Sequence, residues 1–442
     1  MGVPRVSVAD STDVECGLTP PSIAIPPCGL GVRRECAFCF TALKMTDAFF
    51  AQLDLAWLSA RLDNRAVEGI SFDGADLDKL NKTSGLRWAH VTLADGGRVP
   101  LVFKVSATTP LAILLGLARE ALFYCSWAQL PTAAGAECAL GGVLPRVYHA
   151  EGCMATGEKV VVMEDLSAAG AVQLGHVFGG AGAWPGNPNN WGKDVAALTR
   201  GLPPGLGEAA ATRLAFGAAA TLHAPFWGCA ALAAKPWLRG AGWIAGADRE
   251  AWEQAQRHTR EQWAQVKSRL GTASYAVNWD PRLVACIDAA LAKVSWEAFQ
   301  TELRSRPFTL VHGDFHPANL LLVDGGRGVR LIDWEAVGLG SGPQELGQFM
   351  ISHVEPGARA AMERGAVAAY HAELTRLNAR VGMTLAECWA EYVAGGLGRW
   401  LFFLPYDGWG APPAVSQFFC DQVLAFIVAH GVTPETVPMP RM

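Results

Sequence analysis

The sequence predicts an α+β chain in two parts: a small β-sheet with one helix, followed by a larger and mostly helical part. Alternating apolar and polar residues, the pattern of half-buried strands, occur almost entirely before residue 167. Apolar residues at helical spacing dominate after that position. The 442 residues, 51% hydrophobic and 17% charged, are enough to bury the cores of both parts.

The first part begins with an irregular arm. Residues 1–40 are rich in Pro, Gly and Cys and form this predicted arm, and residues 41–166 form the predicted sheet lobe. A hairpin signal, DGGR, joins two strand-like runs, and Thr108 or Thr109 before Pro110 is expected to cap a long helix. The elements expected are a helical segment at 41–70, strands at 87–94 and 99–106, a helix at 108–130, and strands at 145–152 and 158–166.

The second part, residues 167–435, is the predicted helical lobe. It opens with a segment rich in Gly, Ala and Asn at 167–192, which we interpret as a loop or mobile insertion that could act as a lid. The short apolar run VRLIDW at 329–334 is strand-like. Helices are expected at 208–226, 248–270, 281–303, 343–353, 385–404 and 416–430.

Composition excludes several classes of protein. With a net charge of −5, the chain has no excess of positive charge with which to bind nucleic acid. It has no run of 18 apolar residues without a charged residue, so the sequence predicts no membrane span. The first residues lack the apolar region of a secretory signal, which favours a cytoplasmic location with the eleven cysteines reduced. Cys36 and Cys39 form one CxxC pair, but without a second pair a zinc site is disfavoured.

The segment LVHGDFHPANLLL, residues 310–322, places polar groups between two apolar flanks, as in a loop held between buried strands. Asp314 and Asn319 are five residues apart, and Asp333 follows at the end of the next strand-like run. A carboxylate, an amide and a second carboxylate suit phosphoryl transfer from Mg·ATP. Asp314 would receive or orient the proton of the acceptor hydroxyl, and Asn319 and Asp333 would supply oxygen ligands to Mg²⁺.

The sheet lobe holds candidate nucleotide-binding groups. Lys104 lies inside an apolar strand, where a lysine is costly unless it is paired, and Glu120 follows on the next predicted helix. Such a pair fixes phosphate geometry. The run VVVMEDLS ends the sheet, so the backbone at Glu164, Asp165 and Leu166 could hold the adenine edge, and Thr83 and Ser84 could cover the phosphates.

These pieces together resemble the aminoglycoside phosphotransferase and choline kinase-like superfamily, in particular its ecdysteroid-kinase-like branch. The matching segments, spread over about residues 75–355, are FKVS, REALFY, VVMEDL, LHAPFW, HGDFHPANLL and LIDWEAVG. The resemblance implies a protein-kinase-like bilobal fold, with ATP and Mg²⁺ as cofactors and a small-molecule hydroxyl as acceptor. Carried over, Asp314 would be the catalytic base, Asn319 and Asp333 the metal ligands, and Lys104 and Glu120 the phosphate-positioning pair.

Two features depart from that pattern. The candidate phosphate-covering loop has one glycine, Gly85, and not GxGxxG. Glu345 stands where members of the superfamily often have Asp, and we interpret it as a structural acid at a helix start. Among the neighbouring residues, His312 is expected to brace the loop, Glu335 to support the metal ligands from outside, and His223 to pack at the lobe boundary.

Two other functions stay open at this stage. The HxDxH triplet of His312, Asp314 and His316 could bind metals in a hydrolase, but comparable downstream motifs are missing. A catalytically silent, kinase-shaped binding protein is disfavoured because base, metal ligands and lysine are all present. Choline-like amines, aminoglycosides, sterols and acyl alcohols all remain possible acceptors, and the sequence does not determine the oligomeric state. Acceptor selectivity is expected from the second part, including the aromatic run at 399–410.

Overall fold

The structure is a computed structural model of the chain. The predicted N-terminal arm, the Cys36–Cys39 pair, Thr83 and Ser84 lie outside the residues that it describes. The described residues are 49–50, 53–73, 85–133, 138, 140–179, 184, 186–203, 205–273 and 275–441.

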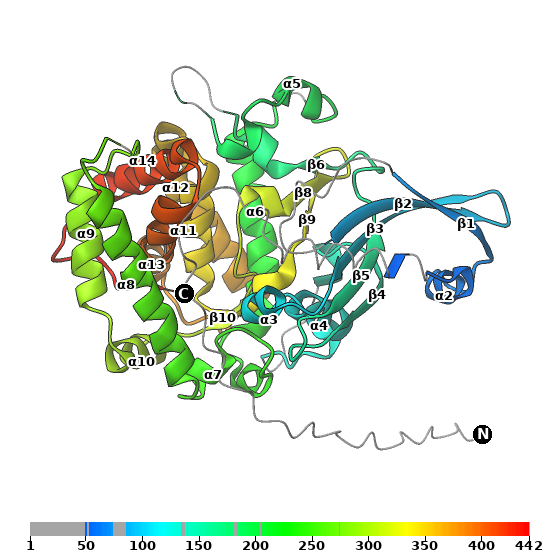
Figure 1. The fold of residues 1–442 in the computed structure, drawn as a ribbon, viewed down its shortest axis with the longest axis horizontal. Coiled ribbons are helices and arrows are strands. Elements are labelled where there is room, and N and C mark those ends of the chain that lie inside the picture. The colour runs from blue at the N-terminus through cyan, green and yellow to red at the C-terminus, as the bar shows by residue number, and fades with distance from the viewer. Residues whose placement is uncertain are drawn as a thin grey trace.

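Five antiparallel strands in the order β1-β2-β3-β5-β4 form the main sheet. The hairpin predicted at 95–98 is confirmed, since β2 and β3 pair along their whole length and turn at Ala94–Gly97. Figure 1 shows this sheet at one end of the molecule and most helices at the other, which confirms the predicted α+β fold with a small sheet lobe and a larger helical lobe. The strands are β1 Val67–Phe72, β2 Gly85–Leu93, β3 Arg98–Ser106, β4 Val147–Gly152 and β5 Lys159–Glu164.

The single long helix predicted at 108–130 is wrong. Thr109 caps helix α3 (Pro110–Leu115) as expected, but Gly116 ends it in the left-handed conformation with φ 68°, and α4 (Arg119–Ser126) starts anew. Glycine adopts this conformation without steric cost, which makes it a common helix terminator. The helical segment predicted at 41–70 is also partly wrong, because in the described residues there only Phe49–Phe50 and the short helix α2 (Leu55–Arg61) are helical before β1 begins at Val67.

The helical lobe contains the predicted helices with two corrections. The helix expected at 281–303 is two helices, because Ser295 caps the second one. Helix α12 (Pro356–Leu377) was not predicted, since its Ala-rich sequence carries little apolar periodicity. The remaining helices are α5 Val195–Leu198, α6 Glu208–His223, α7 Ala241–Ile244, α8 Arg249–Arg269, α9 Pro281–Ala292, α10 Trp296–Arg304, α11 Gly342–His353, α13 Leu385–Gly410 and α14 Pro413–Ala429.

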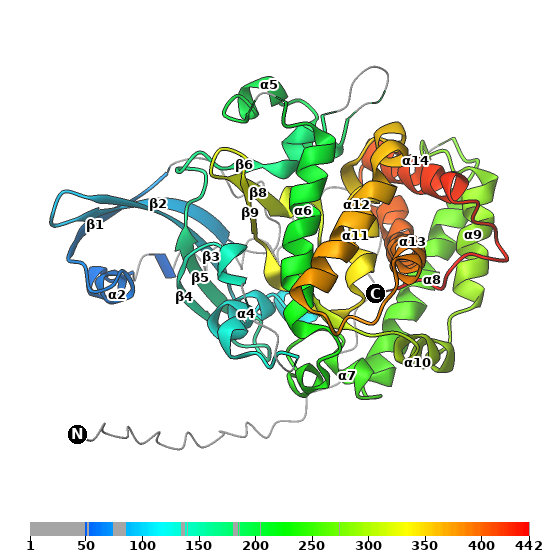
Figure 2. The same cartoon turned by 180° about the vertical axis from the view of Figure 1, so that it is seen from behind.

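The chain forms two further small sheets, of which the one with β6, β8 and β9 lies between the main sheet and the helices (Figure 2). One pairs β7 (Thr309–Val311) with β10 (Gly338–Gly340), and the other has the order β6-β8-β9. Residues 312–319, here called the HGD loop, connect β7 to β8 (Leu320–Val323), so the two small sheets fix both of its ends. Strand β9 (Gly328–Leu331) returns from β8 and leads directly to Asp333.

The segment expected to be a loop or mobile insertion has more structure than predicted. It contributes β6 (Val172–Gln173) and two short 3-10 turns, at Leu174–Val177 and Pro188–Asn190. Gln173 Nε2 donates a hydrogen bond of 2.8 Å to the carbonyl oxygen of Ala318 in the HGD loop. The segment is therefore anchored to the region that the sequence singled out.

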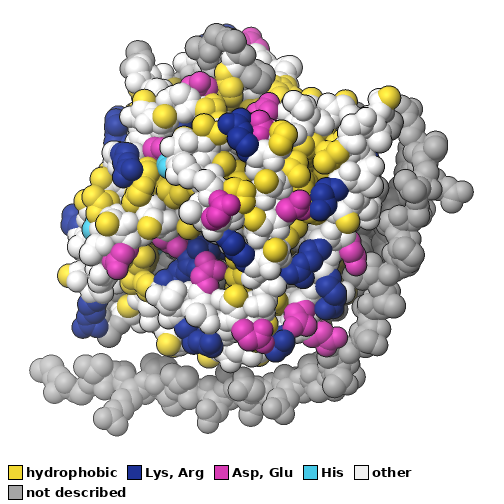
Figure 3. Space-filling view, turned by 90° about the vertical axis from the view of Figure 1, so that its left-hand side faces the viewer, with side chains coloured by type: hydrophobic (Ala, Val, Ile, Leu, Met, Phe, Trp, Pro, Cys, Tyr) yellow, Lys and Arg dark blue, Asp and Glu magenta, His cyan; other side chains and the backbone are white. Residues whose placement is uncertain are grey.

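The outer face of the helical lobe carries acidic, basic and apolar side chains in an interspersed pattern (Figure 3). Among the described residues, none of the helices is both long and apolar enough to cross a membrane.

Candidate active site

Two lysines and three carboxylates, here called the lysine–carboxylate cluster, meet where the sheet faces the segment after β9. Lys104 Nζ lies 2.5 Å from Asp333 Oδ1, 2.8 Å from Glu120 Oε2 and 3.1 Å from Glu335 Oε1. Lys104 is 4% exposed and Glu120 is fully buried, so these are ion pairs in a low-dielectric interior. The structure thus joins Lys104, Glu120 and Asp333, which are far apart in the sequence.

The cluster keeps its members charged despite their burial. Burial raises the pKa of Glu120, but Lys104 and Lys159 outweigh it and lower that pKa from 4.5 to about 2. Burial lowers the pKa of Lys104, but Asp333, Glu120 and Glu335 together raise it well above its usual range. Each charge therefore depends on its opposite partners.

Lys159 is a cluster member that sequence reasoning missed. It is 1% exposed, and its Nζ lies 2.6 Å from Glu120 Oε2 and 2.5 Å from Glu335 Oε1. In the sheet, Lys104 pairs with Val161 and Ser106 pairs with Lys159, so both lysines point to the same face as diagonal neighbours. The available signal was a lysine at the head of the apolar run KVVVME, the same pattern that singled out Lys104.

Glu335 has a more direct position than expected. It was predicted to support the metal ligands from outside, but its carboxylate contacts both lysines. Asp333, Glu335 and Glu120 each place a carboxylate oxygen within 4.8 Å of the others, and they are the group of three or more potential metal-ligating side chains found among the described residues. Asp333 has φ 67° and ψ 64°, a left-handed conformation that is uncommon for a non-glycine residue and often marks functional sites.

The HGD loop brings Asp314 and Asn319 together. Asn319 Nδ2 donates to the carbonyl oxygen of Asp314 at 3.0 Å and to its Oδ2 at 3.2 Å. Gln348 Nε2, on α11, donates to the other carboxylate oxygen at 3.3 Å. Both side-chain hydrogen bonds of Asn319 to described residues use its amide nitrogen, which leaves its Oδ1 as the atom available to a metal. Gln348 could not be recognised from the sequence, because a glutamine within a helical pattern is not unusual.

His316 is the ionisable neighbour of Asp314. Its Nε2 lies 3.3 Å from Asp314 Oδ2, while its Nδ1 accepts from the backbone N–H of Ala318, so the proton faces the carboxylate. Burial raises the pKa of Asp314, but His316 and then His312 lower it well below its usual range. The pKa of His316 is raised, because Asp314 and Asp333 outweigh its burial. Asp314 is therefore a carboxylate at all physiological pH values.

A second histidine links His316 to the segment once expected to be a lid. His353 stacks on His316 with ring centroids 5.3 Å apart, and Asn189 Nδ2 donates to His353 Nε2 at 2.7 Å. Burial, reinforced by His316, lowers the pKa of His353 well below its usual range, so it stays neutral. The 188–190 turn is thus joined to Asp314 through two rings.

Buried polar groups hold the backbone of the HGD loop. Glu345, in the first turn of α11, accepts hydrogen bonds from the N–H groups of His312 at 3.0 Å and Gly313 at 2.6 Å. Its interpretation as a structural acid agrees with these contacts. His312 braces the loop as expected, because both ring nitrogens are engaged, with the backbone of Asp314 and of Ile332.

His223 is fully buried, and it contacts the Tyr370 hydroxyl at 2.8 Å and Glu345 Oε2 at 3.0 Å. It ends helix α6, which lies between the strands β8 and β9 on one side and the helices α11 and α12 on the other (Figure 2). Packing of His223 at the lobe boundary stays a prediction.

Gly313 is required by the loop's conformation. It has φ 82°, and a Cβ added there would overlap the carbonyl oxygen of Ala336. We expect Gly313→Ala to destabilise the protein by roughly 1–3 kcal/mol and to displace Asp314, because both the dihedral angle and the contact become strained. Urea unfolding measures the first effect. The control is Gly410→Ala, where a Cβ meets no heavy atom within 4 Å. Equal stability of the two variants would contradict the prediction.

The segment expected to hold the adenine edge closes the main sheet. Glu164 exchanges hydrogen bonds with Arg146, through its backbone N–H and its carboxylate, and Asp165 N–H donates to the carbonyl oxygen of Pro100. Leu166 is 8% exposed, and no hydrogen bond to its N–H is present among the described residues. Hydrogen bonds to the sheet therefore hold the backbone of this segment in place. The N–H of Leu166 has no acceptor among the described residues.

In comparisons with known proteins, the match to a family model lies in the helical lobe. Residues 189–380 match the family model described as the phosphotransferase enzyme family, APH. The match contains the HGD loop and Asp333 but not Lys104 or Glu120, and it covers less than half of the chain. No curated protein matches the chain significantly.

Solved structures with a similar course of the chain include three kinases or phosphotransferases. A macrolide 2'-phosphotransferase from Brachybacterium faecium has 17% identity and a TM-score of 0.39, over 83% of this chain and 97% of its own. An ethanolamine kinase from Plasmodium vivax has 9% identity and a TM-score of 0.42, over 81% and 82%. A choline kinase from Cryptosporidium parvum has 11% identity and a TM-score of 0.41, over 82% and 88%. Residue roles in this chain rest on its own geometry.

Proposed function

We propose that the protein transfers the γ-phosphoryl group of ATP, in a Mg²⁺-dependent reaction, to a hydroxyl group of a small molecule. The observation that carries this proposal is the ion-paired cluster of buried Lys104, buried Glu120 and half-buried Asp333, combined with the paired Asp314 and Asn319 of the HGD loop. The match of residues 189–380 to a phosphotransferase family supports it. Membership of the ecdysteroid-kinase-like branch, the lobe boundaries and a cytoplasmic location stay predictions.

The residues present fit a magnesium–nucleotide complex. Asp333 and the free Oδ1 of Asn319 are the oxygen ligands that we assign to Mg²⁺, a cation that needs few protein ligands. Bound Mg²⁺ would neutralise charge on the phosphates. The cluster contains three carboxylates and two lysines, so it has one negative charge left over for a cation.

Lys104 and the end of the sheet would hold the nucleotide itself. Glu120 fixes the Lys104 ammonium group at 2.8 Å, so that it can contact the phosphates from a defined position. Glu164, Asp165 and Leu166 supply the backbone edge for adenine, with the N–H of Leu166 as the free donor. We keep Ser84 as a candidate for covering the phosphates.

Asp314 acts on the acceptor hydroxyl. Three donors on Asn319, Gln348 and His316 hold its carboxylate in place. Its lowered pKa makes it a weak base, so we infer that it chiefly orients the hydroxyl and takes its proton as the new O–P bond forms.

The arrangement of the HxDxH triplet does not favour the alternative function, a metal-dependent hydrolase. Both ring nitrogens of His312 are engaged inside the loop, and neither His312 nor His316 belongs to the potential metal-binding group found among the described residues. A silent binding protein differs from the proposed enzyme only in turnover, so measurement of transfer decides between them.

Thermal unfolding with Mg·ATP tests nucleotide and metal binding without knowledge of the acceptor. A ligand at a hundredfold excess over Kd stabilises by about 2.7 kcal/mol, which raises Tm by about 3 °C for a chain of this length. We expect this shift for the wild type, its loss with EDTA, and its loss in Asp333→Ala. Mg·GTP measures base selectivity.

The matched control is Asp324→Ala. Asp324 also has a left-handed backbone, with φ 52°, but lies in the exposed turn between β8 and β9. Both variants change the same residue type in the same backbone conformation, but only Asp333→Ala removes the proposed metal ligand and its ion pair with Lys104. An equal Mg·ATP shift in both variants, or no shift in the wild type, would overturn the proposal.

A further inference from the structure

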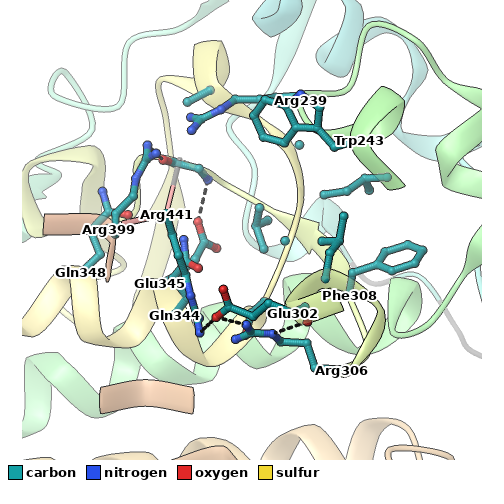
Figure 4. Close-up of a pocket in the computed structure, with 18 of the residues that line it drawn as sticks. Arg239, Trp243, Glu302, Arg306, Phe308, Gln344, Glu345, Gln348, Arg399 and Arg441 are labelled. Atoms are coloured by element: carbon teal, nitrogen blue, oxygen red, sulfur yellow. Dashed lines mark hydrogen bonds and ion pairs between the residues drawn. The ribbon is translucent and has the colours of Figure 1, made fainter. Parts of the chain in front are cut away.

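A cavity of about 90 Å³ lies beside the HGD loop, enclosed by β7, β10 and the helices α7, α10, α11 and α13. Figure 4 shows the side chains that line it. Gly313 and Gln348 form part of its wall, and both are direct neighbours of Asp314, one in the chain and one by a hydrogen bond. Trp243, Phe299 and Phe308 make much of the remaining wall apolar. A group in this cavity therefore lies next to the carboxylate that we assign to the acceptor hydroxyl.

Two arginines of the wall, Arg239 and Arg399, form no ion pair with an acid in the part of the chain that the structure describes. Arg399 is 3% exposed; its Nη2 donates to the carbonyl oxygen of Gly313 at 2.9 Å, and its Nη1 is buried without a partner among the described residues. Arg239 uses its backbone N–H and carbonyl oxygen to bond Val337 and Leu339, but its guanidinium forms no ion pair with any described residue. Arg239 and Arg399 line the same cavity as Gly313.

The same cavity offers an internal comparison. Arg306 and Arg441, on the opposite side, are neutralised by Glu302 and Glu391, with Arg441 at 2.5 Å from each acid. The protein thus supplies carboxylates to one arginine pair and none at ion-pair distance to the other. Of the two arginine pairs in this cavity, Arg239 and Arg399 are therefore the pair without a carboxylate of the described residues at ion-pair distance.

Arg399 is buried and Arg239 is half-buried, and cations without an ion-pair partner are costly when they lie close together at such a site. Burial lowers the pKa of Arg399 well below its usual range, and Arg239 lowers it further. Asp314 and Glu345 offset this repulsion only at a distance, since neither forms an ion pair with Arg239 or Arg399. An oxyanion that bridged the two guanidinium groups would remove the repulsion and satisfy Arg399 Nη1, because the planar arginine fork matches carboxylate and phosphate oxygens.

We propose that Arg239 and Arg399 form a subsite for an anionic group, a carboxylate or phosphate, carried by the acceptor. This inference rests on the proposed function and specifies its substrate class: a hydroxy acid or a phosphate-bearing alcohol, with its short apolar part against Trp243, Phe299 and Phe308. The small volume admits the acidic end of such a molecule rather than a bulky ring system. A cationic acceptor would leave both arginines unneutralised and is disfavoured.

The test measures anion binding by thermal unfolding at constant ionic strength, with inorganic phosphate, lactate and isopropanolamine as probes. Lactate and isopropanolamine are small secondary alcohols of opposite charge. We expect phosphate and lactate, near a hundredfold excess over Kd, to raise the wild-type Tm by about 2–3 °C and isopropanolamine to leave it unchanged. Arg239→Met should lose this response and, without anion, unfold no earlier than the wild type, because it removes an unpaired charge.

The control is Arg306→Met, which changes an arginine of the same cavity that already has carboxylate partners. It should lose stability but keep the response to phosphate and lactate. Equal anion responses in the wild type and Arg239→Met would overturn the subsite.

Mg·ATP and Mg·ADP distinguish the source of the anion. If the acceptor carries it, Arg239→Met keeps the wild-type shift with both nucleotides. A weaker shift with Mg·ATP alone would assign the arginines to the γ-phosphate and overturn the acceptor subsite. Failure of the proposed function has a different signature, namely no magnesium-dependent ATP shift in the wild type itself.

Discussion

Asp314→Asn is expected to lower the rate of phosphoryl transfer by about 10²–10⁴-fold while leaving Mg·ATP binding near the wild-type value. The range is typical for removal of a positioned proton acceptor. Asn keeps the shape of the side chain, but its amide nitrogen cannot accept the bonds that Asn319, Gln348 and His316 now donate. Nucleotide binding should persist because Lys104 and Asp333 belong to the separate lysine–carboxylate cluster.

ADP release in the presence of a panel of hydroxyl acceptors measures the loss, and thermal unfolding with Mg·ATP measures retained binding. Asp288→Asn, a change of the same type in an exposed pair with Lys267, serves as the control. Near-full activity of Asp314→Asn would show that this carboxylate is not involved in the reaction. Loss of the Mg·ATP shift in the same variant would place Asp314 in the nucleotide site instead.

Glu120→Gln is expected to reduce stability at neutral pH by roughly 3–5 kcal/mol, as breaking a buried ion pair does. Glu120 Oε2 is the shared partner of Lys104 at 2.8 Å and Lys159 at 2.6 Å, so the neutral amide leaves two buried cations with reduced compensation. The same variant should bind Mg·ATP more weakly, because Lys104 loses the contact that holds its position. Urea unfolding and the Mg·ATP shift measure the two effects.

The stability difference should depend on pH in a defined direction. The pKa of Glu120 is lowered on folding from 4.5 to about 2, so its carboxylate stabilises the fold above pH 4.5 and loses this contribution as the pH falls towards 2. The gap between wild type and Glu120→Gln should therefore be constant near neutral pH and shrink in acid. Glu253→Gln, which removes an exposed pair with Arg249, should cost less than about 1 kcal/mol. A gap that widened in acid would contradict this account.

The candidate site could be predicted where local sequence carries the signal. A lysine inside an apolar strand, and polar residues between two buried strands, are improbable without a function, so Lys104, Asp314, Asn319 and Asp333 stood out. The structure places Asp314 and Asn319 in contact and joins Lys104 to Asp333 and Glu120. The chemical roles of these residues are proposals, and the experiments described above test them.

Other members of the site had a weak signal or none. Lys159 shares the strand pattern of Lys104, but its partners Glu120 and Glu335 come from distant segments, so nothing local marked it as buried and paired. Arg239 looks like an ordinary solvated charge in the sequence, and Arg399 was included only as the first residue of the aromatic run at 399–410. Only their positions beside Gly313, away from any carboxylate partner, set them apart.

The sequence by itself determined the α+β division, the strand hairpin, the polar loop between buried strands and the residues able to bind a metal or accept a proton. Those features depend on periodicity, turn residues and residue chemistry, which act over short distances along the chain. The tertiary structure decided which charges are neutralised by direct contact: two lysines share Glu120, while Arg239 and Arg399 form no ion pair with a described acid and are offset only at a distance by Asp314 and Glu345. Charge compensation depends on distances between segments far apart in the chain, and only the packed fold determines these distances.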